Sequence, residues 1–569
     1  MKKYLLTVLL ISSILFTGLA QSPTNATLRT GSIVLRGTII APEGVIKHGY
    51  VAIVNGRITS VSDKQPDLPD AVKVNTNGII LPGLVDVHNH VPFNVFPRWK
   101  PGRLFSNRNQ WRTDPEVVAK INGPMDRLAP SHFCDMNAWG ELRALVGGTT
   151  SIMVTQSQPC INGLVRNLDF NSGFYGTTEL NREHIFNVLD LPPADNPAAR
   201  AAFVGAANFF IANPFYEALF IHLAEGTDAA AQEEFTFMQS QSLLNPKGIV
   251  IHGISLSAPD FRAMGTNGTA LVWSPRSNIE LYGKTTNILA ALDAGVEIAI
   301  APDWAVTGSS NILGELKVAD QWNRERLGGR LTDKQLVDMV TSVPAHIAGI
   351  DDQVGAIKVG LRADILVIKS ENENPHRGVI DASAAEVQLV FVDGVPLYGD
   401  RQLMKQFWNQ TQLEEISLPG ITKSLATPAT NIVVANIEQR LKLALQGEGI
   451  ALASLTGPGD FVLPPSTTAA ISNRSKNLDT DEKKISNDIK LSVTALSNPS
   501  RAHFTLNTRS ESSAPIQLRV LDAFGRIVET KSRIVPNSTF NIGYNFKPGA
   551  YLVEVIQGKQ RQTLKLIRQ

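Results

Sequence analysis

The pattern of apolar and polar residues changes twice in the first 400 residues. From residue 31 to about residue 80, apolar and polar residues alternate between glycine turns, as in the stretch YVAIVNGRI at 50–58. This period of two predicts short antiparallel strands. From 81 to about 350, apolar strand cores alternate with helical stretches, which predicts repeated βα units and a parallel sheet. Short strands return over 351–400.

Seven strand cores stand out in the middle stretch. They are 84–87, 150–154, 185–189, 219–222, 249–252, 270–273 and 296–301. An eighth strand, which a closed barrel requires, is not assigned between residues 154 and 219. We nevertheless expect an α/β fold with a TIM-like (β/α)8 barrel over 81–350, because the residues that suggest chemistry follow the carboxyl ends of these strands, where such barrels keep their active sites.

Further β-rich regions are predicted outside the barrel. Neither 31–80 nor 351–400 holds enough strands for a core of its own, so we expect the two to form one small composite β-sandwich. Residues 456–488 are rich in Ser, Thr, Pro, Asn, Lys and Asp without a period, which is typical of a linker. Residues 491–569 alternate again and predict a separate C-terminal all-β sandwich.

Composition narrows the classes of function. A length of 569 residues suits two to four domains. The 53 basic and 52 acidic residues give a net charge of +1, which argues against a nucleic-acid partner or a polybasic membrane contact. A small-molecule substrate is therefore favoured, and a homo-oligomer is left open.

Residues 1–20 have the three regions of a secretory signal peptide: Lys2 and Lys3, an apolar stretch to Phe16, and small residues up to Ala20. A membrane anchor is the alternative, but the apolar run is shorter than the ~20 residues that a span needs. Export would allow Cys134 and Cys160, the only two cysteines, to pair, although two unpaired thiols fit the sequence nearly as well.

Ligand-type side chains follow four of the predicted strands. His88 and His90 stand at i and i+2 after the first, so both imidazoles can face one ion. A pair of hydrogen-bonded strand-end histidines is the alternative for such a motif alone. His222 ends a later strand, with Glu225 three residues on, and the ends of two more carry His252 and Asp303.

Each of the later residues also has an ordinary explanation. Asp303 alone would be a helix N-cap, Glu225 a solvated loop carboxylate, and His252 a core histidine. The recurrence of such residues at successive strand ends favours a shared site over coincidence.

These residues suit a catalytic metal. We expect the metal ligands His88, His90, His222 and Asp303, with zinc favoured over iron as the divalent ion. A bound ion lowers the pKa of its water toward ~7, and Asp303 is placed to take the proton of that water. Glu225 would protonate a ring nitrogen or the leaving group, and His252 would orient the attacking hydroxide or stabilise developing charge.

With these motifs, the sequence resembles the amidohydrolase superfamily, in particular its mononuclear aminohydrolase-like branch. The resemblance covers about 31–400, and its motifs also include the run SPRSN at 274–278. It implies one zinc or iron ion that activates water to cleave non-peptide C–N bonds, in the deamination of amino-heterocycles or the opening of cyclic amides. No lysine ends the predicted fourth strand, where binuclear relatives carry a carboxylated lysine, so one ion is expected.

Several features depart from that branch or leave its details open. Ala301 and Pro302 replace the usual residues before the aspartate, and the stretch from 150 to 222 is short for the branch. The run at 274–278 is interpreted as a positioning loop. Four aromatic residues are candidates to line a pocket for a flat ring, with plain packing as the alternative: Trp99, Trp111, Trp304 and Phe93.

The C-terminal segment resembles the sorting domain of the type IX secretion system. The matching runs are VLDAFGRIV at 520–528 and GAYLVEV at 549–555. The resemblance implies export through the periplasm to the cell surface or the medium, with the type IX machinery as partner. A small carbohydrate-binding or adhesive sandwich is the alternative.

The sequence therefore predicts a secreted metal-dependent hydrolase of a small C–N substrate. An Xaa-Pro dipeptidase-like or N-acyl amino acid hydrolase of the same superfamily, which usually needs two metal ions, is the enzymatic alternative. The non-enzymatic alternative is a surface binding protein whose barrel is only a scaffold.

Overall fold

The chain forms two compact units, residues 1–464 and 465–569. The computed structural model describes residues 31–153, 164–168, 186–214, 216–430, 432–457 and 461–464 of the first unit. In the second unit it describes 491–569 except 496–497, 501, 511, 513, 523–525, 537, 545 and 558–559. The predicted signal peptide and residues 465–488 of the predicted linker lie outside the described residues.

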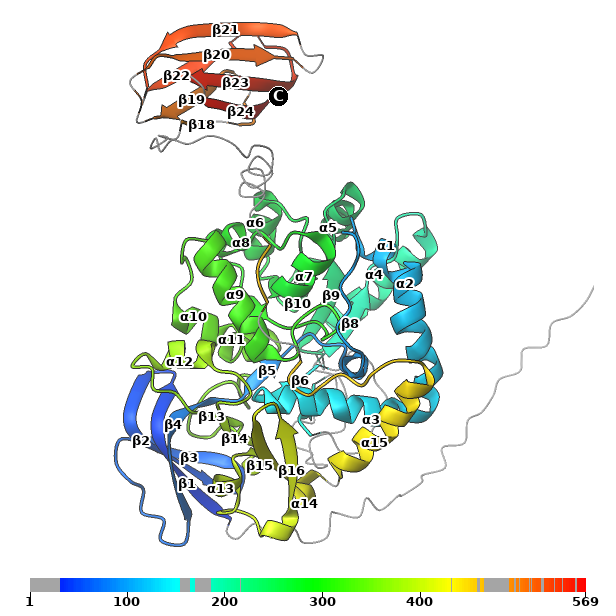
Figure 1. Ribbon diagram of the computed structural model, residues 1–569, viewed down its shortest axis with the longest axis vertical. Helices are drawn as coiled ribbons and strands as arrows, with labels where there is room; N and C mark the ends of the chain where they lie inside the picture. The colour runs from blue at the N-terminus through cyan, green and yellow to red at the C-terminus, as the bar shows by residue number, and fades with distance from the viewer. Residues whose placement is uncertain are drawn as a thin grey trace, which may run out of the picture. The chain divides into compact units, whose positions relative to one another are not determined.

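A nine-stranded sheet combines strands from both sides of the barrel segment. Its strands, in sheet order, are β16 (Leu413–Leu418), β17 (Ile421–Ala426), β15 (Val395–Gly399), β14 (Val387–Val392), β13 (Ile365–Ile368), β4 (Val72–Pro82), β1 (Ser32–Ala41), β2 (Gly44–Val54) and β3 (Arg57–Ser62). Figure 1 shows the N-terminal strands in blue beside the later strands in yellow-green.

Strand β4 joins the two halves of this sheet. It pairs in parallel with β1 and antiparallel with β13, where Leu366 lies opposite Leu81. The two flanks therefore share one β-structure, as predicted, but it is a single nine-stranded sheet where a sandwich was expected, and it extends past residue 400 to Ala426. In β16 the pair Glu414 and Glu415 interrupts the apolar alternation, which hides this strand in the sequence.

Among the described residues, eight short parallel strands form the barrel segment. The first three pair in the order β5 (Leu84–Asp86), β6 (Thr149–Ile152) and β7 (Arg166–Asn167). The other five are β8 (Phe186–Asp190), β9 (Ala218–Leu223), β10 (Gly248–His252), β11 (Ala270–Trp273) and β12 (Ile298–Ile300). The strand that the sequence did not reveal is β7, which has only two residues and carries Arg166 and Asn167 instead of an apolar core.

The first and last strands of this series meet at their carboxyl ends. Asn89, beyond β5, forms a parallel bridge with Asp303, beyond β12. The Asp303 N–H donates to the His88 carbonyl at 3.1 Å, and the His90 N–H donates to the Asp303 carbonyl at 2.8 Å. The predicted α/β fold class is confirmed, and this contact brings residues far apart in sequence to one end of the strands.

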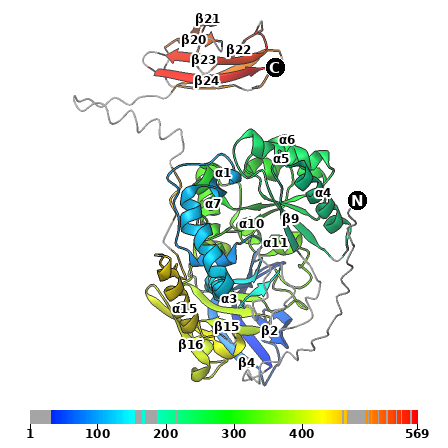
Figure 2. The same ribbon diagram turned by 90° about the vertical axis from the view of Figure 1, so that its right-hand side faces the viewer.

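Helices follow most of these strands and cover them from outside, as α4, α5 and α6 do in Figure 2. The helices around the barrel are α3 (Gly123–Val146), α4 (Pro197–Ala212), α5 (Ala229–Ser240), α6 (Ala258–Thr266), α7 (Pro275–Tyr282), α8 (Ile288–Asp293), α9 (Ile312–Arg326), α10 (Asp333–Asp338) and α11 (Ser342–Ile347). Shorter or flanking helices are α1 (Arg108–Arg112), α2 (Pro115–Val117), α12 (Pro375–Asp381), α13 (Arg401–Met404), α14 (Thr427–Thr430) and α15 (Val434–Gly447). Among the described helices, none combines the length and the apolar composition of a membrane span.

The strands of the barrel are buried on both faces. On β9, Ala218 and Phe220 belong to one apolar cluster, whereas Leu219 and Ile221 belong to another. Such burial on both sides is typical of a parallel sheet that helices cover. It leaves the carboxyl ends of the strands as the place where polar side chains gather.

The second unit is an all-β sandwich, as predicted. One sheet has the order β18 (Ser492–Ala495), β19 (Phe504–Arg509) and β22 (Thr539–Ile542). The other has the order β21 (Ile527–Ile534), β20 (Ile516–Leu521), β23 (Gly549–Gln557) and β24 (Gln560–Arg568). Apolar residues of both sheets, such as Phe504 and Val553, form one buried cluster.

Of the two cysteines, Cys134 in α3 is disulfide-bonded. Cys160 lies outside the described residues.

Candidate metal centre

The two histidines after β5 point toward the carboxylate that follows β12. The backbone bridge between Asn89 and Asp303 sets this approach. Asp303 Oδ1 lies 3.5 Å from the Nε2 atoms of both His88 and His90. The side chain of His88 is fully buried, whereas that of His90 keeps 24% of its surface exposed.

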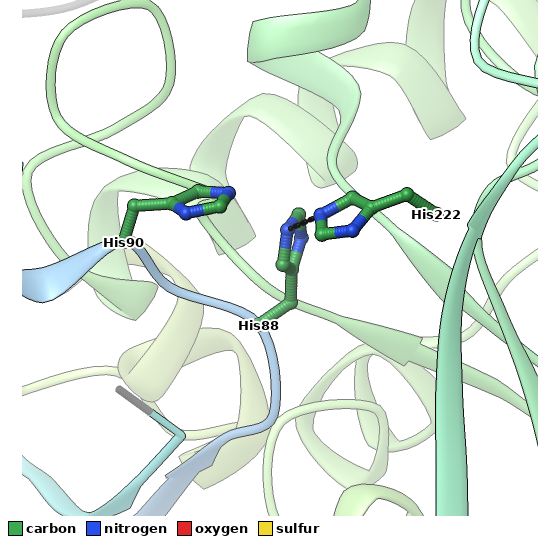
Figure 3. Close-up of side chains that lie close together, drawn as sticks. All are labelled: His88, His90 and His222. Carbon is green, nitrogen blue, oxygen red and sulfur yellow. Dashed lines mark hydrogen bonds between the residues drawn. The ribbon is translucent and has the colours of Figure 1, made fainter. Parts of the chain in front are cut away.

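His222, near the end of β9, completes the group. Its Nε2 lies 3.1 Å from His88 Nε2, and Figure 3 shows the rings of His88, His90 and His222 directed toward one another. Two nitrogens bound to a tetrahedral zinc at ~2.1 Å lie about 3.4 Å apart, which is close to the spacing here. The described residues form two candidate metal-binding groups, His88 with His90 and His222, and His88 with His252 and Asp303.

A second carboxylate orients His222. Asp190, the last residue of β8, places its Oδ1 2.9 Å from His222 Nδ1. This contact puts the ring proton on Nδ1 and leaves Nε2 free for a metal ion. Arg112 Nη1 donates to Asp190 Oδ2 at 2.9 Å, so both carboxylate oxygens have partners. Burial raises the pKa of Asp190, but His222 and Arg112 outweigh this effect and hold the pKa below its usual value.

Sequence reasoning missed Asp190 as a site residue. The sequence does contain a signal for it. Asp190 directly follows the strand predicted at 185–189, as the predicted ligands follow other strands.

We expect Asp190→Asn to weaken zinc binding by about 10- to 100-fold, because His222 would lose the charge that fixes its tautomer. The measurement is competition for zinc between the metal-free protein and a calibrated chelator. Asp195→Asn is the matched control, since Asp195 is exposed in the turn before α4. Equal zinc affinity in Asp190→Asn and wild type would contradict the positioning role of Asp190.

Helix α7 holds the side chains that flank the metal group. Pro275 stands at its first turn and Gly283 ends it with φ of +66°, both usual for helix ends. Ser277 Oγ donates to Asp303 Oδ2 at 2.5 Å. The run at 274–278 was predicted to be a loop; that prediction is wrong, because the run forms the start of this helix.

Asn278, the next residue of α7, fixes the tautomer of His252. Asn278 Nδ2 lies 3.2 Å from Thr285 Oγ1, so its Oδ1 is the oxygen that faces His252 Nδ1 at 2.9 Å. Because an amide oxygen only accepts, His252 carries its proton on Nδ1. The Nε2 of the neutral ring is then an acceptor, and it lies 3.8 Å from Glu225 Oε2.

Glu225 is buried, not solvated, with 2% of its surface exposed. The hydroxyl of Tyr282, at the end of α7, donates to Glu225 Oε1 at 2.6 Å. Burial raises the pKa of Glu225, but His252, Arg112 and Arg108 together hold it below the usual value. Glu225 is therefore ionised at neutral pH.

Backbone strain concentrates around these residues. Three non-glycine residues there have positive φ: Ala224 at +55°, His252 at +72° and Asp303 at +69°. Such conformations are uncommon for residues with a side chain and are typical of functional sites. Each allows the chain to turn sharply at a strand end, and the side chains of His252 and Asp303 line the cavity.

Electrostatics favour the metal-binding form of the imidazoles. Burial, together with neighbouring imidazoles, lowers the pKa of His88 well below 6.5 and that of His90 to about 3. Burial also lowers the pKa of His252 to about 4. Burial raises the pKa of Asp303 well above 3.8, and the hydrogen bond from Ser277 opposes this effect in part. A cation at these ligands would remove the cause of that shift, since it stabilises the charged carboxylate.

A cavity of about 260 Å³ opens onto the group. Three aromatic residues line it: Phe93, Trp111 and Trp304. The Trp304 ring lies 5.5 Å from that of Trp111 and 5.7 Å from that of Phe93. Trp99 is not among the lining residues; it packs against Phe105 in the core, with ring centroids 6.1 Å apart.

The structure thus brings all six predicted site residues to one end of the strands. His88, His90 and His222 form one candidate metal-binding group, and Asp303, which lies 3.5 Å from the Nε2 atoms of His88 and His90, shares the second group with His88 and His252. Glu225 and His252 line the same cavity. Their individual roles stay predictions.

Comparison with known proteins identifies the class. Residues 220–397 match the amidohydrolase family, and residues 497–569 match the secretion system C-terminal sorting domain. The chain therefore carries an amidohydrolase domain followed by a sorting domain, as its motifs predicted.

Similar curated proteins align with about two thirds of this chain. A 5-methylthioadenosine/S-adenosylhomocysteine deaminase of Syntrophus aciditrophicus is 22% identical over 422 residues, which are 66% of this chain and 93% of that protein. A 5'-deoxyadenosine deaminase of Methanosarcina barkeri is 22% identical over 406 residues, which are 64% of this chain and 92% of that protein.

Solved structures show the same fold. Atrazine chlorohydrolase from Arthrobacter aurescens, complexed with zinc, is 17% identical with a TM-score of 0.51 and covers 64% of this chain and 95% of its own. Guanine deaminase from E. coli is 18% identical with a TM-score of 0.50 and covers 64% of this chain and 99% of its own.

Proposed function

We propose that this protein is a secreted, single-metal hydrolase that deaminates a flat amino-heterocycle. The observation that carries the proposal is the convergence of His88, His90, His222 and Asp303 beside a cavity with aromatic walls. The names of the curated relatives, which are deaminases of adenine-containing compounds, favour an amino-purine among the possible heterocycles.

The donor set fits one divalent ion, with zinc favoured and iron as the alternative. When bound, the ion supplies an activated water as nucleophile. Asp303 would accept a proton from the attacking water through one carboxylate oxygen, while Ser277 Oγ holds the other, Oδ2. A C–O bond forms at the ring carbon, the C–N bond to the amino group breaks, and ammonia leaves.

Four other side chains would contact the substrate or the attacking water. Trp111 and Trp304 hold the flat ring by stacking or edge contacts. Glu225, which is ionised in the free protein, takes up a proton from solvent water and transfers it to the ring nitrogen or the leaving amine. His252 presents the acceptor Nε2 to the attacking water and orients it.

One ion is favoured over two. The residue that ends β8 is Asp190, whose oxygens face His222 Nδ1 and Arg112 Nη1. With both oxygens occupied, Asp190 supports the first ion through His222 and is poorly placed to bridge a second. This disfavours the peptidase-like alternative, which usually needs a binuclear centre.

The test is a screen of the zinc-loaded full chain for ammonia release, with chromatography to detect ring-opened products and cleaved dipeptide. The panel contains adenine, guanine, cytosine, 5'-methylthioadenosine, 5'-deoxyadenosine, the cyclic ureide hydantoin and a glycyl-proline dipeptide. Release of ammonia from an amino-heterocycle is the expected result, at about one zinc per chain. Hydrolysis of the dipeptide alone, with two ions per chain, would replace the proposal with the peptidase-like alternative. No turnover of any compound would favour the surface binding protein.

Export is the second part of the proposal. The sorting domain supports passage through the periplasm to the cell surface or the medium by the type IX machinery. Deleting 491–569 should leave the protein in the periplasm of the source bacterium, as cell fractionation would show. Normal export of the shortened chain would contradict this route.

A further inference from the structure

A chain of hydrogen bonds runs from the cavity wall to Glu225. Trp111 Nε1 donates to the Tyr282 hydroxyl at 2.8 Å, and that hydroxyl lies 2.6 Å from Glu225 Oε1. Tyr282 and Glu225 are buried, with 4% and 2% of their surfaces exposed. Glu225 and Trp111 both line the cavity. The chain therefore connects a substrate-facing ring to the carboxylate that we assign to proton transfer.

Two anchored helices set this geometry. Arg108, at the start of α1, donates to the His222 carbonyl at 3.2 Å and to Glu234 Oε2 at 2.9 Å. Trp111 follows three residues later on the same face of α1. In α7, Asn278 and Tyr282 are four residues apart and also share a face, so one helix positions both His252 and Glu225.

The direction of the hydrogen bonds follows from the donors. An indole N–H can only donate, so the oxygen of Tyr282 accepts from Trp111. The single phenolic hydrogen then points to Glu225 Oε1. The reverse arrangement, with a protonated Oε1 donating to Tyr282, would leave the phenolic hydrogen without an acceptor among the described residues, which is costly for a buried hydroxyl.

The two oxygens of Glu225 therefore differ. Oε1 is an acceptor in this chain, whereas Oε2 is the oxygen that faces His252 Nε2 at 3.8 Å. A proton that Glu225 takes up must reside on Oε2, on the side of His252.

We propose that Tyr282 is a positioning residue that, held by Trp111, keeps the mobile proton of Glu225 on Oε2 and ready for transfer into the cavity. The inference rests on the proposed function. In the transfer, the Oε2–H bond breaks and an N–H bond forms on the ring nitrogen or the amine, while the electron pair of the O–H bond stays on Oε2. Without the hydroxyl of Tyr282, the proton can occupy either oxygen, and one of the two positions is unproductive.

Tyr282→Phe tests the positioning role, because it keeps the ring and removes only the hydroxyl. The substrate is the panel compound that the wild type turns over fastest. We expect kcat to fall by about 10- to 100-fold, the effect of losing one hydrogen bond to a charged group, with KM within about twofold of wild type. Zinc content and the thermal midpoint should match the wild type. An unchanged kcat would overturn the proposal.

Tyr398→Phe is the matched control. Tyr398 in β15 is fully buried, and its hydroxyl has no hydrogen-bond partner among the described residues. This variant should keep the wild-type kcat.

A double-mutant cycle shows whether Tyr282 acts through Glu225. In a Glu225→Gln background, Tyr282→Phe should cause no further loss of kcat, because the group that it positions is already gone. A further loss of tenfold or more would show an independent role and refute the proposal.

An infrared measurement that needs no substrate tests the positioning role of Tyr282 independently of the proposed function. The carboxylate bands of Glu225 are obtained at pH 7 as the infrared difference between wild type and Glu225→Gln. Because Oε1 alone accepts the strong hydrogen bond, the two C–O bonds are unequal, and Tyr282→Phe should bring the asymmetric and symmetric bands closer together. Unchanged bands would refute the positioning of Oε1 even if the enzyme proves active. If no panel compound reacts, the proposed function fails, but the infrared result still tests the positioning role of Tyr282.

Discussion

Removal of the divalent ion should abolish ammonia release, and added zinc should restore it. We expect a loss of at least about 100-fold in kcat/KM, because activation of water by a metal ion contributes several kcal/mol that neutral side chains cannot replace. The measurement compares the zinc-loaded chain, the chain dialysed against a chelator, and the same sample after zinc, iron or manganese is added back.

Two controls make this result specific. Circular dichroism should show that the metal-free chain remains folded, since the apolar clusters of the barrel do not involve the ligands. Elemental analysis should confirm that the ion has been removed. A chain that is verified metal-free and still turns over substrate at the wild-type rate would contradict the metal-dependent mechanism.

Asp303→Asn should be the most damaging conservative substitution in the site. The amide is nearly isosteric and can still accept the hydrogen bond from Ser277, but it cannot take a proton from water. We expect kcat to fall by about 10²- to 10⁴-fold, which is the usual contribution of a general base. Assays at saturating zinc, with the bound zinc measured in parallel, separate this loss from weaker metal binding.

Asp293→Asn provides the matched control, because the Asp293 side chain is 69% exposed at the end of α8 and makes only a long ion pair with Arg330 at 3.5 Å. It should leave kcat unchanged. If Asp303→Asn binds zinc and keeps more than a tenth of the wild-type kcat, Asp303 is not the base.

The barrel could be predicted from the sequence because most of its strands are apolar runs with ligands at their ends. Strand β9 combines the run ALFIHL with His222 and is buried along its whole length. Strand β7 could not be found in this way, because it has two polar residues and depends on its neighbours for burial. Arg166 in β7 forms a buried ion pair with Asp364, a partner that is distant in sequence.

The site residues that could be predicted from the sequence are those that lie on or after strands. The six predicted residues sit on or directly after strands, so their position along the chain gives their position in space. Tyr282 and Trp111 lie on helices, and only the fold shows that they meet through a hydrogen bond of 2.8 Å. Asp190 could have been predicted as a site residue, because it directly follows a predicted strand. Its contact with His222 Nδ1, however, is visible only in the structure.

We propose that one metal ion binds at the carboxyl ends of β5, β9 and β12. An anomalous-difference map from crystals of the zinc-loaded protein tests it most directly. We expect one strong peak per chain, about 2.0–2.2 Å from Nε2 of His88, His90 and His222 and from a carboxylate oxygen of Asp303. No peak among these four side chains, or a peak held by other residues, would contradict it.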